Sequence, residues 1–135
     1  MILKISREDL EKIFKHAIEC FPTECCGILA GKRLKEGNVV EKVYPTRNLL
    51  ESSFEYQLDP EEQVRIFKDA ETHGLEVIGF YHSHTISDTY WSRVDDERSK
   101  LWPGYVFLVV SPKSGNFRAY FRGENGTIEI QVKFL

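Results

Sequence analysis

The sequence has few cysteines, three in 135 residues, and all of them lie between Cys20 and Cys26. An odd number of cysteines so close together does not form a disulfide framework, and it fits a reducing compartment. A chain of this length buries roughly two-thirds of its unfolded surface, so it needs neither disulfides nor a zinc finger for stability. Because free cysteine is usually buried, we expect Cys25 and Cys26 to be small core residues rather than ligands or nucleophiles.

Long apolar runs are absent as well. No stretch approaches the roughly 20 residues of a membrane-spanning helix, and the segment Met1-Ile2-Leu3-Lys4 has no secretory signal pattern. The net charge is −3, with both signs scattered along the chain, which argues against the basic patch of a nucleic-acid-binding protein. We therefore predict a cytoplasmic protein that binds neither membranes nor nucleic acid, and a homodimer is compatible with this composition.

The length predicts one domain, residues 1–135, and three segments have helical signals. The first helix ends near Phe21-Pro22 and carries one apolar face, formed by Leu10, Ile13, Phe14, Ala17 and Ile18. The second begins with Asp59 as its cap and Pro60 at its first position, and its apolar stripe is Val64, Phe67 and Ala70. The third helix begins at Ser92.

Short runs of β-branched and aromatic residues between turn signals predict strands. Their ranges are Ile2–Ile5, Gly27–Gly31, Val39–Tyr44, Phe54–Leu58, Val77–Tyr81, Tyr105–Val110, Phe117–Phe121 and Thr127–Phe134. We expect Gly37-Asn38 to form the turn of a hairpin and the last three strands to form a meander. Because strands and helices do not alternate as repeated βαβ units, the sequence predicts an α+β fold, a mixed sheet with about three packed helices.

The segment from Phe80 to Asp95 gathers two histidines, a serine and an aspartate at the spacing of a metal site. His82 and His84 stand at the end of a predicted strand, and residues two apart in a strand point to the same face. Both imidazoles can therefore converge on one ion while Ser83 faces away.

Asp95 supplies a third candidate ligand. It lies three residues after Ser92 at a helix start, so these two side chains are neighbours. Two histidines and one carboxylate make three protein ligands, and a catalytic zinc has three protein ligands with an open fourth position. Zinc suits these ligands, and iron, cobalt or nickel also accept them. The reaction still needs a base, and Glu24, between a predicted helix and a predicted strand, is the candidate.

An upstream glutamate, His-x-His, seven residues and Ser-x-x-Asp form the signature of the JAMM (MPN-plus) metalloproteases. This sequence resembles that family at Glu24, His82, His84, Ser92 and Asp95. The similarity to small stand-alone prokaryotic members extends over nearly the whole chain, including Pro22–Gly27, Leu58-Asp59-Pro60, Gly79 and Pro103-Gly104-Tyr105. The resemblance implies a cytidine-deaminase-like JAMM/MPN fold, with one zinc per chain held by His82, His84 and Asp95. It also implies Glu24 as general base and Ser92 as a donor to the oxyanion.

The resemblance also supplies a substrate class. Members of the family hydrolyse amide or isopeptide bonds after the C-terminal Gly-Gly of ubiquitin or a ubiquitin-like modifier, and prokaryotic members act on small modifiers or sulfur carriers. We therefore expect a zinc metallopeptidase whose partner is a ubiquitin-like modifier or sulfur-carrier protein. Release of a single amino acid from a sulfur-carrier C-terminus is an alternative within the family, and a catalytically silent binding or scaffold domain is an alternative outside catalysis.

Two positions depart from the family pattern. Proline usually follows the second histidine and precedes the serine, whereas this chain has Thr85 and Trp91. Neither residue is a ligand, so we expect the metal site to persist. The loop between them has lost two restraints on the backbone angle φ, and we expect its conformation to differ from that of relatives.

Each part of the motif has a simpler explanation when it is taken alone. Histidines at a strand end are satisfied by hydrogen bonds in many proteins, Ser92 and Asp95 fit a helix capping box, and Glu24 fits a surface carboxylate. The joint occurrence of all these residues favours the metal centre. A zinc deaminase is a further enzymatic alternative, but its His-x-Glu followed by Pro-Cys-x-x-Cys is absent.

Overall fold

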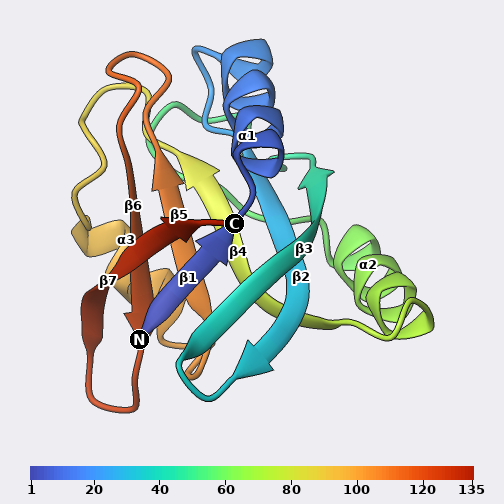
Figure 1. Cartoon of the computed structure of the whole chain (residues 1–135). Coiled ribbons are helices and arrows are strands. Elements are labelled where there is room, and N and C mark those ends of the chain that lie inside the picture. Colours follow the sequence, from blue (N-terminus) through green and yellow to red (C-terminus); the bar gives the residue numbers. More distant parts are fainter.

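The computed structural model describes all 135 residues, and its seven strands form a mixed sheet that closes into a barrel (Figure 1). In chain order the strands are β1 (Ile2–Ile5), β2 (Cys26–Leu34), β3 (Gly37–Thr46), β4 (Glu76–Ser83), β5 (Val106–Val110), β6 (Phe117–Arg122) and β7 (Thr127–Phe134). Around the barrel the order is β1-β3-β2-β4-β5-β6-β7, and β1 closes it by pairing in parallel with both β3 and β7. The pair β4 and β5 is also parallel, and the remaining pairs, including the predicted terminal meander, are antiparallel.

Three helices complete the predicted α+β fold: α1 (Arg7–Cys20), α2 (Pro60–Thr72) and α3 (Arg93–Ser99). The Ser6 hydroxyl caps α1 by accepting from the Asp9 N–H at 3.0 Å, and the Asp59 carboxylate caps α2 by accepting from the Glu61 N–H at 2.9 Å. No helix combines the length and the apolar character that crossing a membrane requires. The expected likeness to cytidine deaminases stays a prediction.

The main core fills the inside of the barrel. All seven strands contribute side chains to it, and α1 adds Leu10, Ile13 and Ala17. A second core lies between the outer face of the sheet and α2, and its buried members are Ile28, Ala30, Ile66, Ala70, Val77, Phe80 and Phe107. Strand β4 is therefore buried on both faces: Tyr81 faces the main core, while Phe80 faces the second one. By the same alternation, His82 emerges on the Phe80 side of the sheet.

The buried faces of α1 and α2 differ from the predicted stripes at two positions. Ile18 of α1 is 63% exposed and Val64 of α2 is 56% exposed. In α2 the buried residues are Ile66 and Ala70 instead. A helix that rests on a barrel buries only the strip nearest to the strands, and periodicity cannot tell which apolar residues face that strip.

The hairpin of β2 and β3 turns at Lys35-Glu36, so the turn predicted at Gly37-Asn38 was wrong. Gly37 begins β3 with a φ of 154°, and the backbone of Ile2 lies where a side chain of residue 37 would be. The glycine therefore permits the close approach of β1 rather than forming the turn.

Residues 54–58 do not form a strand, although their alternation predicted one. Phe54 is 72% exposed, and the segment makes only an isolated bridge. The Asn48 side chain holds the segment instead, because its Nδ2 donates to the Glu55 carbonyl and its Oδ1 accepts from the Gln57 N–H, both at 3.1 Å. Local side-chain hydrogen bonds thus replace the ladder that the pattern suggested.

Candidate metal centre and active site

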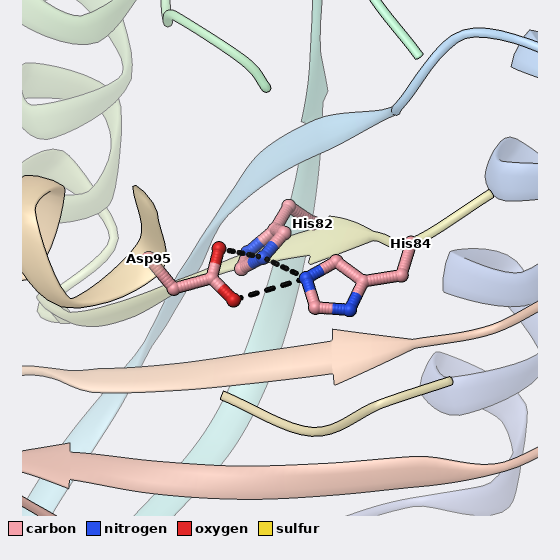
Figure 2. A group of neighbouring side chains, drawn as sticks. All are labelled: His82, His84 and Asp95. Atoms are coloured by element: carbon pink, nitrogen blue, oxygen red, sulfur yellow. Dashed lines mark hydrogen bonds and ion pairs between the residues drawn. The ribbon is translucent and has the colours of Figure 1, made fainter. Parts of the chain in front are cut away.

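The end of β4 carries both histidines of the candidate site. His82 lies inside the strand and His84 directly follows it, and their Nε2 atoms are 3.3 Å apart, so the rings converge as predicted (Figure 2). Ser83 points the other way, where its hydroxyl accepts from the Cys25 backbone N–H at 2.8 Å. Ser83 thereby ties the segment that carries Glu24 to the strand that carries the histidines.

The start of α3 carries the candidate aspartate. Ser92 and Asp95 form a capping box: Ser92 Oγ accepts from the Asp95 N–H at 3.0 Å, and Asp95 Oδ2 accepts from the Ser92 N–H at 3.1 Å. This arrangement confirms the prediction that the side chains of Ser92 and Asp95 lie close together. Figure 2 shows the Asp95 side chain pointing from the helix toward both histidines.

The Asp95 carboxylate bridges the two imidazoles. Its Oδ1 lies 2.9 Å from His82 Nε2, and its Oδ2 lies 3.0 Å from His84 Nε2. All three side chains are at most 5% exposed, and one ligand atom from each lies within 4.8 Å of the others. The structure therefore brings the three candidate ligands together in one buried cluster.

This cluster has the donor set of a transition-metal site. His84 Nδ1 lies 2.7 Å from the Asp88 carbonyl oxygen. Since a carbonyl only accepts, Nδ1 carries a proton and Nε2 is the nitrogen left for a metal. Two atoms that bind one tetrahedral zinc at about 2.0–2.1 Å lie about 3.3–3.4 Å apart, in agreement with the 3.3 Å between the two Nε2 atoms. His82, His84 and Asp95 could thus hold a metal ion.

The charges of the cluster shift the pKa values of Asp95 and His84. Burial by itself would raise the pKa of Asp95, but the His82 charge and the hydrogen bonds from both histidines hold that pKa well below its usual range. Burial would lower the pKa of His84, and the hydrogen bond and charge of Asp95 raise it instead. The buried Asp95 carboxylate thus lies against two imidazoles in the metal-free protein, and a bound cation would also offset its charge.

Glu24 lies between α1 and β2 and within reach of the charges of this cluster. Its N–H donates to the Ser52 carbonyl at 2.8 Å, and its carbonyl accepts from Asn48 Nδ2 at 3.1 Å, so its backbone is fixed on both sides. The residue is 4% exposed, and burial raises the pKa of its carboxyl group to about 8, with the His84 charge opposing the shift. A carboxyl group with a pKa near neutrality is suited both to take and to return a proton.

The neighbouring cysteines are core residues, as predicted. Cys25 and Cys26 are both buried, and burial raises the pKa of the Cys25 thiol to about 12 and that of Cys26 to about 11. Because the thiolate is the reactive form, these cysteines are poor nucleophiles and poor redox sensors. They leave the chemistry of the site to Glu24 and the cluster.

Sequence analysis missed how the two imidazoles are held. The Tyr56 ring stacks on His82, with centroids 4.6 Å apart and an interplanar angle of 25°, while His82 Nδ1 has no hydrogen-bond partner. His84 is held differently, by the carbonyl of Asp88. The position of Tyr56 in the sequence does not indicate that its ring contacts His82. Asp88 was expected only to be a polar residue of the loop.

The loop 85–91 is packed without the prolines that relatives usually have there. Thr85 is buried, and its hydroxyl donates to the Ser53 carbonyl at 2.9 Å. The Trp91 ring packs against Phe107 and Tyr120, with centroids 5.7 and 4.7 Å apart. His82, His84 and Asp95 lie together although neither residue 85 nor residue 91 is a proline.

A hollow of about 290 Å³ lies beside Tyr56, between the start of α2 and the end of α3. Its walls are mostly apolar, with a few polar groups; the lining residues include Tyr56, Gln57, Leu58, Gln63, Phe80, Arg98, Trp102 and Phe107. Such a mixture is typical of ligand pockets. The hollow adjoins Tyr56, the residue whose ring stacks on His82.

Curated proteins of known activity resemble this chain over most of its length. A desampylase of Haloferax volcanii is 40% identical over 115 residues, which cover 82% of this chain and 81% of the relative. A desampylase of Pyrococcus furiosus is 36% identical over 133 residues, covering 98% of this chain and 89% of the relative. A CysO-cysteine peptidase of Mycobacterium tuberculosis is 32% identical over 121 residues, covering 88% of this chain and 82% of the relative.

Solved structures also resemble this chain. The solution structure of a Desulfitobacterium hafniense protein superimposes with a TM-score of 0.88 at 28% identity, covering 98% of this chain and 92% of that one. A Salinibacter ruber protein, with a TM-score of 0.75 and 24% identity, shares the fold over 98% of this chain and 91% of its own. The sequence profile of the family described as prokaryotic homologs of the JAB domain matches residues 6–123. The chain therefore belongs to the prokaryotic homologs of the JAB domain, and it is a JAMM-type peptidase or isopeptidase.

Proposed function

We propose that this enzyme uses one Zn²⁺ to hydrolyse the amide or isopeptide bond after the C-terminal Gly-Gly of a ubiquitin-like modifier or sulfur-carrier protein. The observation that carries the proposal is the buried cluster of His82, His84 and Asp95, with the buried carboxyl group of Glu24 in its electrostatic reach. The relatives named desampylase and CysO-cysteine peptidase support this class of substrate.

The residues of the chain divide the steps of hydrolysis among them. His82, His84 and Asp95 would hold the zinc ion, which would supply Lewis acidity to lower the pKa of a water to about 7 and to polarise a carbonyl. Glu24 takes a proton from the attacking water and then gives it to the leaving amine. Its raised pKa, about 8 in the metal-free protein, favours holding the proton between these two steps. The Ser92 hydroxyl donates a hydrogen bond to the oxyanion that develops on the substrate carbonyl.

Ser92 serves this mechanism while it caps α3. The cap uses a lone pair of Oγ to accept from the Asp95 N–H, which leaves the hydroxyl hydrogen free to donate. Replacing Ser92 by alanine removes both interactions. We expect kcat to fall on the order of 10²-fold with little change in KM, as is typical for loss of one oxyanion donor.

Two further substitutions separate the cap from the donor. Glycine at an N-cap costs only a few tenths of a kcal/mol, whereas alanine costs about 1 kcal/mol. Ser92→Gly should therefore lose kcat as Ser92→Ala does while keeping more of the thermal stability, and Ser92→Thr should retain both. If Ser92→Gly turned over substrate at the wild-type rate, the hydroxyl would have no catalytic role.

The proposal is tested with carriers extended beyond their Gly-Gly. We would incubate a panel of bacterial and archaeal ubiquitin-like carriers, each joined after Gly-Gly to a reporter protein, with the wild-type enzyme before and after removal of metal by a chelator. Cleavage should require metal, return when zinc is added back, and occur directly after Gly-Gly. Metal-independent cleavage would contradict the proposal, and absence of cleavage across the panel would favour a binding or scaffold domain.

The leaving group is tested in the same assay. Carriers extended by one cysteine or one lysine are compared with carriers joined to a whole protein, and kcat/KM is measured for each. Faster release of a single amino acid would assign a role in processing sulfur carriers, and faster release of a protein would assign the removal of a modifier. Preferential cleavage of linked ubiquitin chains would contradict the prokaryotic substrate class.

A further inference from the structure

The orientation of His84 depends on one carbonyl group. His84 Nδ1 donates to the Asp88 carbonyl oxygen at 2.7 Å, and this bond keeps the proton on Nδ1 and turns Nε2 toward Asp95. The Ser87 hydroxyl lies 3.5 Å from the same Nδ1. If the Asp88 carbonyl moved away, Ser87 could donate to Nδ1 instead, which favours the tautomer with its proton on Nε2. That tautomer has no lone pair on Nε2, the nitrogen that faces Asp95 and the proposed metal site.

The side chain of Asp88 anchors the carbonyl of the same residue. Its Oδ1 accepts from the Thr89 N–H at 2.8 Å and from the Ser114 hydroxyl at 3.2 Å, and its Oδ2 accepts from Asn116 Nδ2 at 2.9 Å. Ser114 and Asn116 belong to the connection between β5 and β6. The Asp88 carboxylate thus fastens the loop that follows His84 to the β5–β6 connection, which lies beside it at the same end of the barrel.

Little else fixes the backbone immediately around Asp88. Ile86 and Ser87 before it and Tyr90 after it are exposed. Thr89 is buried, and its carbonyl accepts from the Tyr120 hydroxyl at 2.8 Å, which holds the residue that follows. Before the carbonyl of residue 88 the backbone is exposed, so the restraints on its position are the Asp88 carboxylate and the Tyr120 hydroxyl.

We propose that Asp88 is a positioning residue for the metal ligand His84, acting through its own carbonyl, which its carboxylate holds in place against Ser114 and Asn116. This inference rests on the proposed metal site. Partners that orient a metal-bound histidine typically contribute 10- to 100-fold in metal affinity. We expect Asp88→Ala to weaken zinc binding by about that factor, although the residue touches neither metal nor substrate.

The charge of Asp88 offers a competing explanation, since a nearby carboxylate also attracts a cation. Substitutions of Ser114 and Asn116 distinguish the position of Asp88 from its charge. The double variant Ser114→Ala, Asn116→Ala keeps the charge of Asp88 and removes two of the three donors to its carboxylate. If position matters, this variant should lose most of the affinity that Asp88→Ala loses, and adding Asp88→Ala to it should cost little more. The exchange Asp88→Asn, Asn116→Asp restores the hydrogen bond with donor and acceptor reversed, and it should recover affinity.

The experiment measures the zinc dissociation constant of each variant by competition with a chelator, beside wild type and the control Glu76→Ala. Glu76 also makes one surface contact, with Arg33 at 2.8 Å, but it lies at the other end of β4. Wild-type affinity in Asp88→Ala would overturn the inference. So would wild-type affinity in the double alanine variant, because it would assign the effect to charge.

A second readout needs no metal. In the metal-free protein, NMR relaxation of the backbone amides of residues 85–91 should show more ps–ns motion in Asp88→Ala and in the double alanine variant than in wild type or Glu76→Ala. An unchanged loop would also overturn the inference. If wild type bound no zinc, the proposed function would fail, while the relaxation data would still show whether Asp88 anchors the loop.

Discussion

Replacing Glu24 by glutamine should slow turnover severely and leave zinc bound. Glutamine keeps the shape of the side chain but cannot take a proton from water, and general base catalysis typically contributes 10²- to 10⁴-fold. We therefore expect kcat on an extended carrier to fall by about 10² to 10⁴. Zinc content and KM should stay near wild type, because Glu24 is not one of the three clustered ligands.

The matched control is Glu129→Gln, the same change at an exposed carboxylate that pairs only with Arg118 at 3.1 Å. It should retain wild-type kcat. Zinc content by mass spectrometry and initial rates are measured on the same preparations. A metal-loaded Glu24→Gln protein with wild-type turnover would remove Glu24 from the mechanism.

The same substitution should change how the stability of the metal-free protein depends on pH. The pKa of Glu24 is raised from 4.5 to about 8 by burial, so the folded protein keeps this proton over a range in which the unfolded chain has lost it. Wild type therefore loses stability as pH rises through this range, and the neutral glutamine does not. Urea unfolding at several pH values should show Glu24→Gln gaining stability over wild type from about pH 4.5 to 8, and a constant difference would contradict the raised pKa.

Replacing Asp95 by alanine should remove zinc from the protein. The change deletes one of three ligands and leaves two imidazole nitrogens facing each other at 3.3 Å without the carboxylate between them. We expect a loss of zinc affinity greater than the 10- to 100-fold typical of residues that only orient a ligand, and no measurable turnover. His82→Ala should behave in the same way.

The thermal midpoint provides the measurement. A ligand that binds only the folded state stabilises it by about 4 kcal/mol at a free concentration of about 1,000 times Kd, so added zinc should raise the Tm of wild type and not that of Asp95→Ala. Asp96→Ala is the matched control: Asp96 follows directly on the same helix, but it bonds to Trp91 Nε1 at 3.2 Å and Arg122 Nη1 at 3.3 Å rather than to the histidines. An equal rise in Tm for Asp95→Ala would show that the metal binds elsewhere.

The local part of the cluster's geometry could be predicted from sequence, while its role as a ligand set stays a prediction. His82 and His84 converge because a strand places alternate residues on one face, and Asp95 meets Ser92 because a helix start places residues three apart together. The approach of Glu24 to the cluster was inferred from the family motif, since its position depends on how β2 pairs with β4. The contact of Tyr56 with His82 could not be predicted, because it depends entirely on tertiary packing.

The closure of the barrel could not be predicted either. Strands Ile2–Ile5 and Thr127–Phe134 were both expected, but hydrophobic alternation reports that a segment is a strand and not which strand lies beside it. Their parallel pairing joins Ile2 to Gln131 and Ile5 to Phe134 from opposite ends of the chain. The wrong prediction of a strand at residues 54–58 has a different cause. The alternation is present, but the Asn48 side chain forms the backbone hydrogen bonds that a neighbouring strand would otherwise form.

Helix α3 is seven residues long, too short to be stable by itself. Its first turn is secured by Asp95, and one atom of that side chain, Oδ2, faces both the Ser92 N–H and His84 Nε2. We therefore expect order in the helix to depend on whether a metal occupies the cluster. When zinc is scarce, local opening should begin at α3 while the barrel stays closed, so the supply of metal would govern how long the folded protein resists proteolysis.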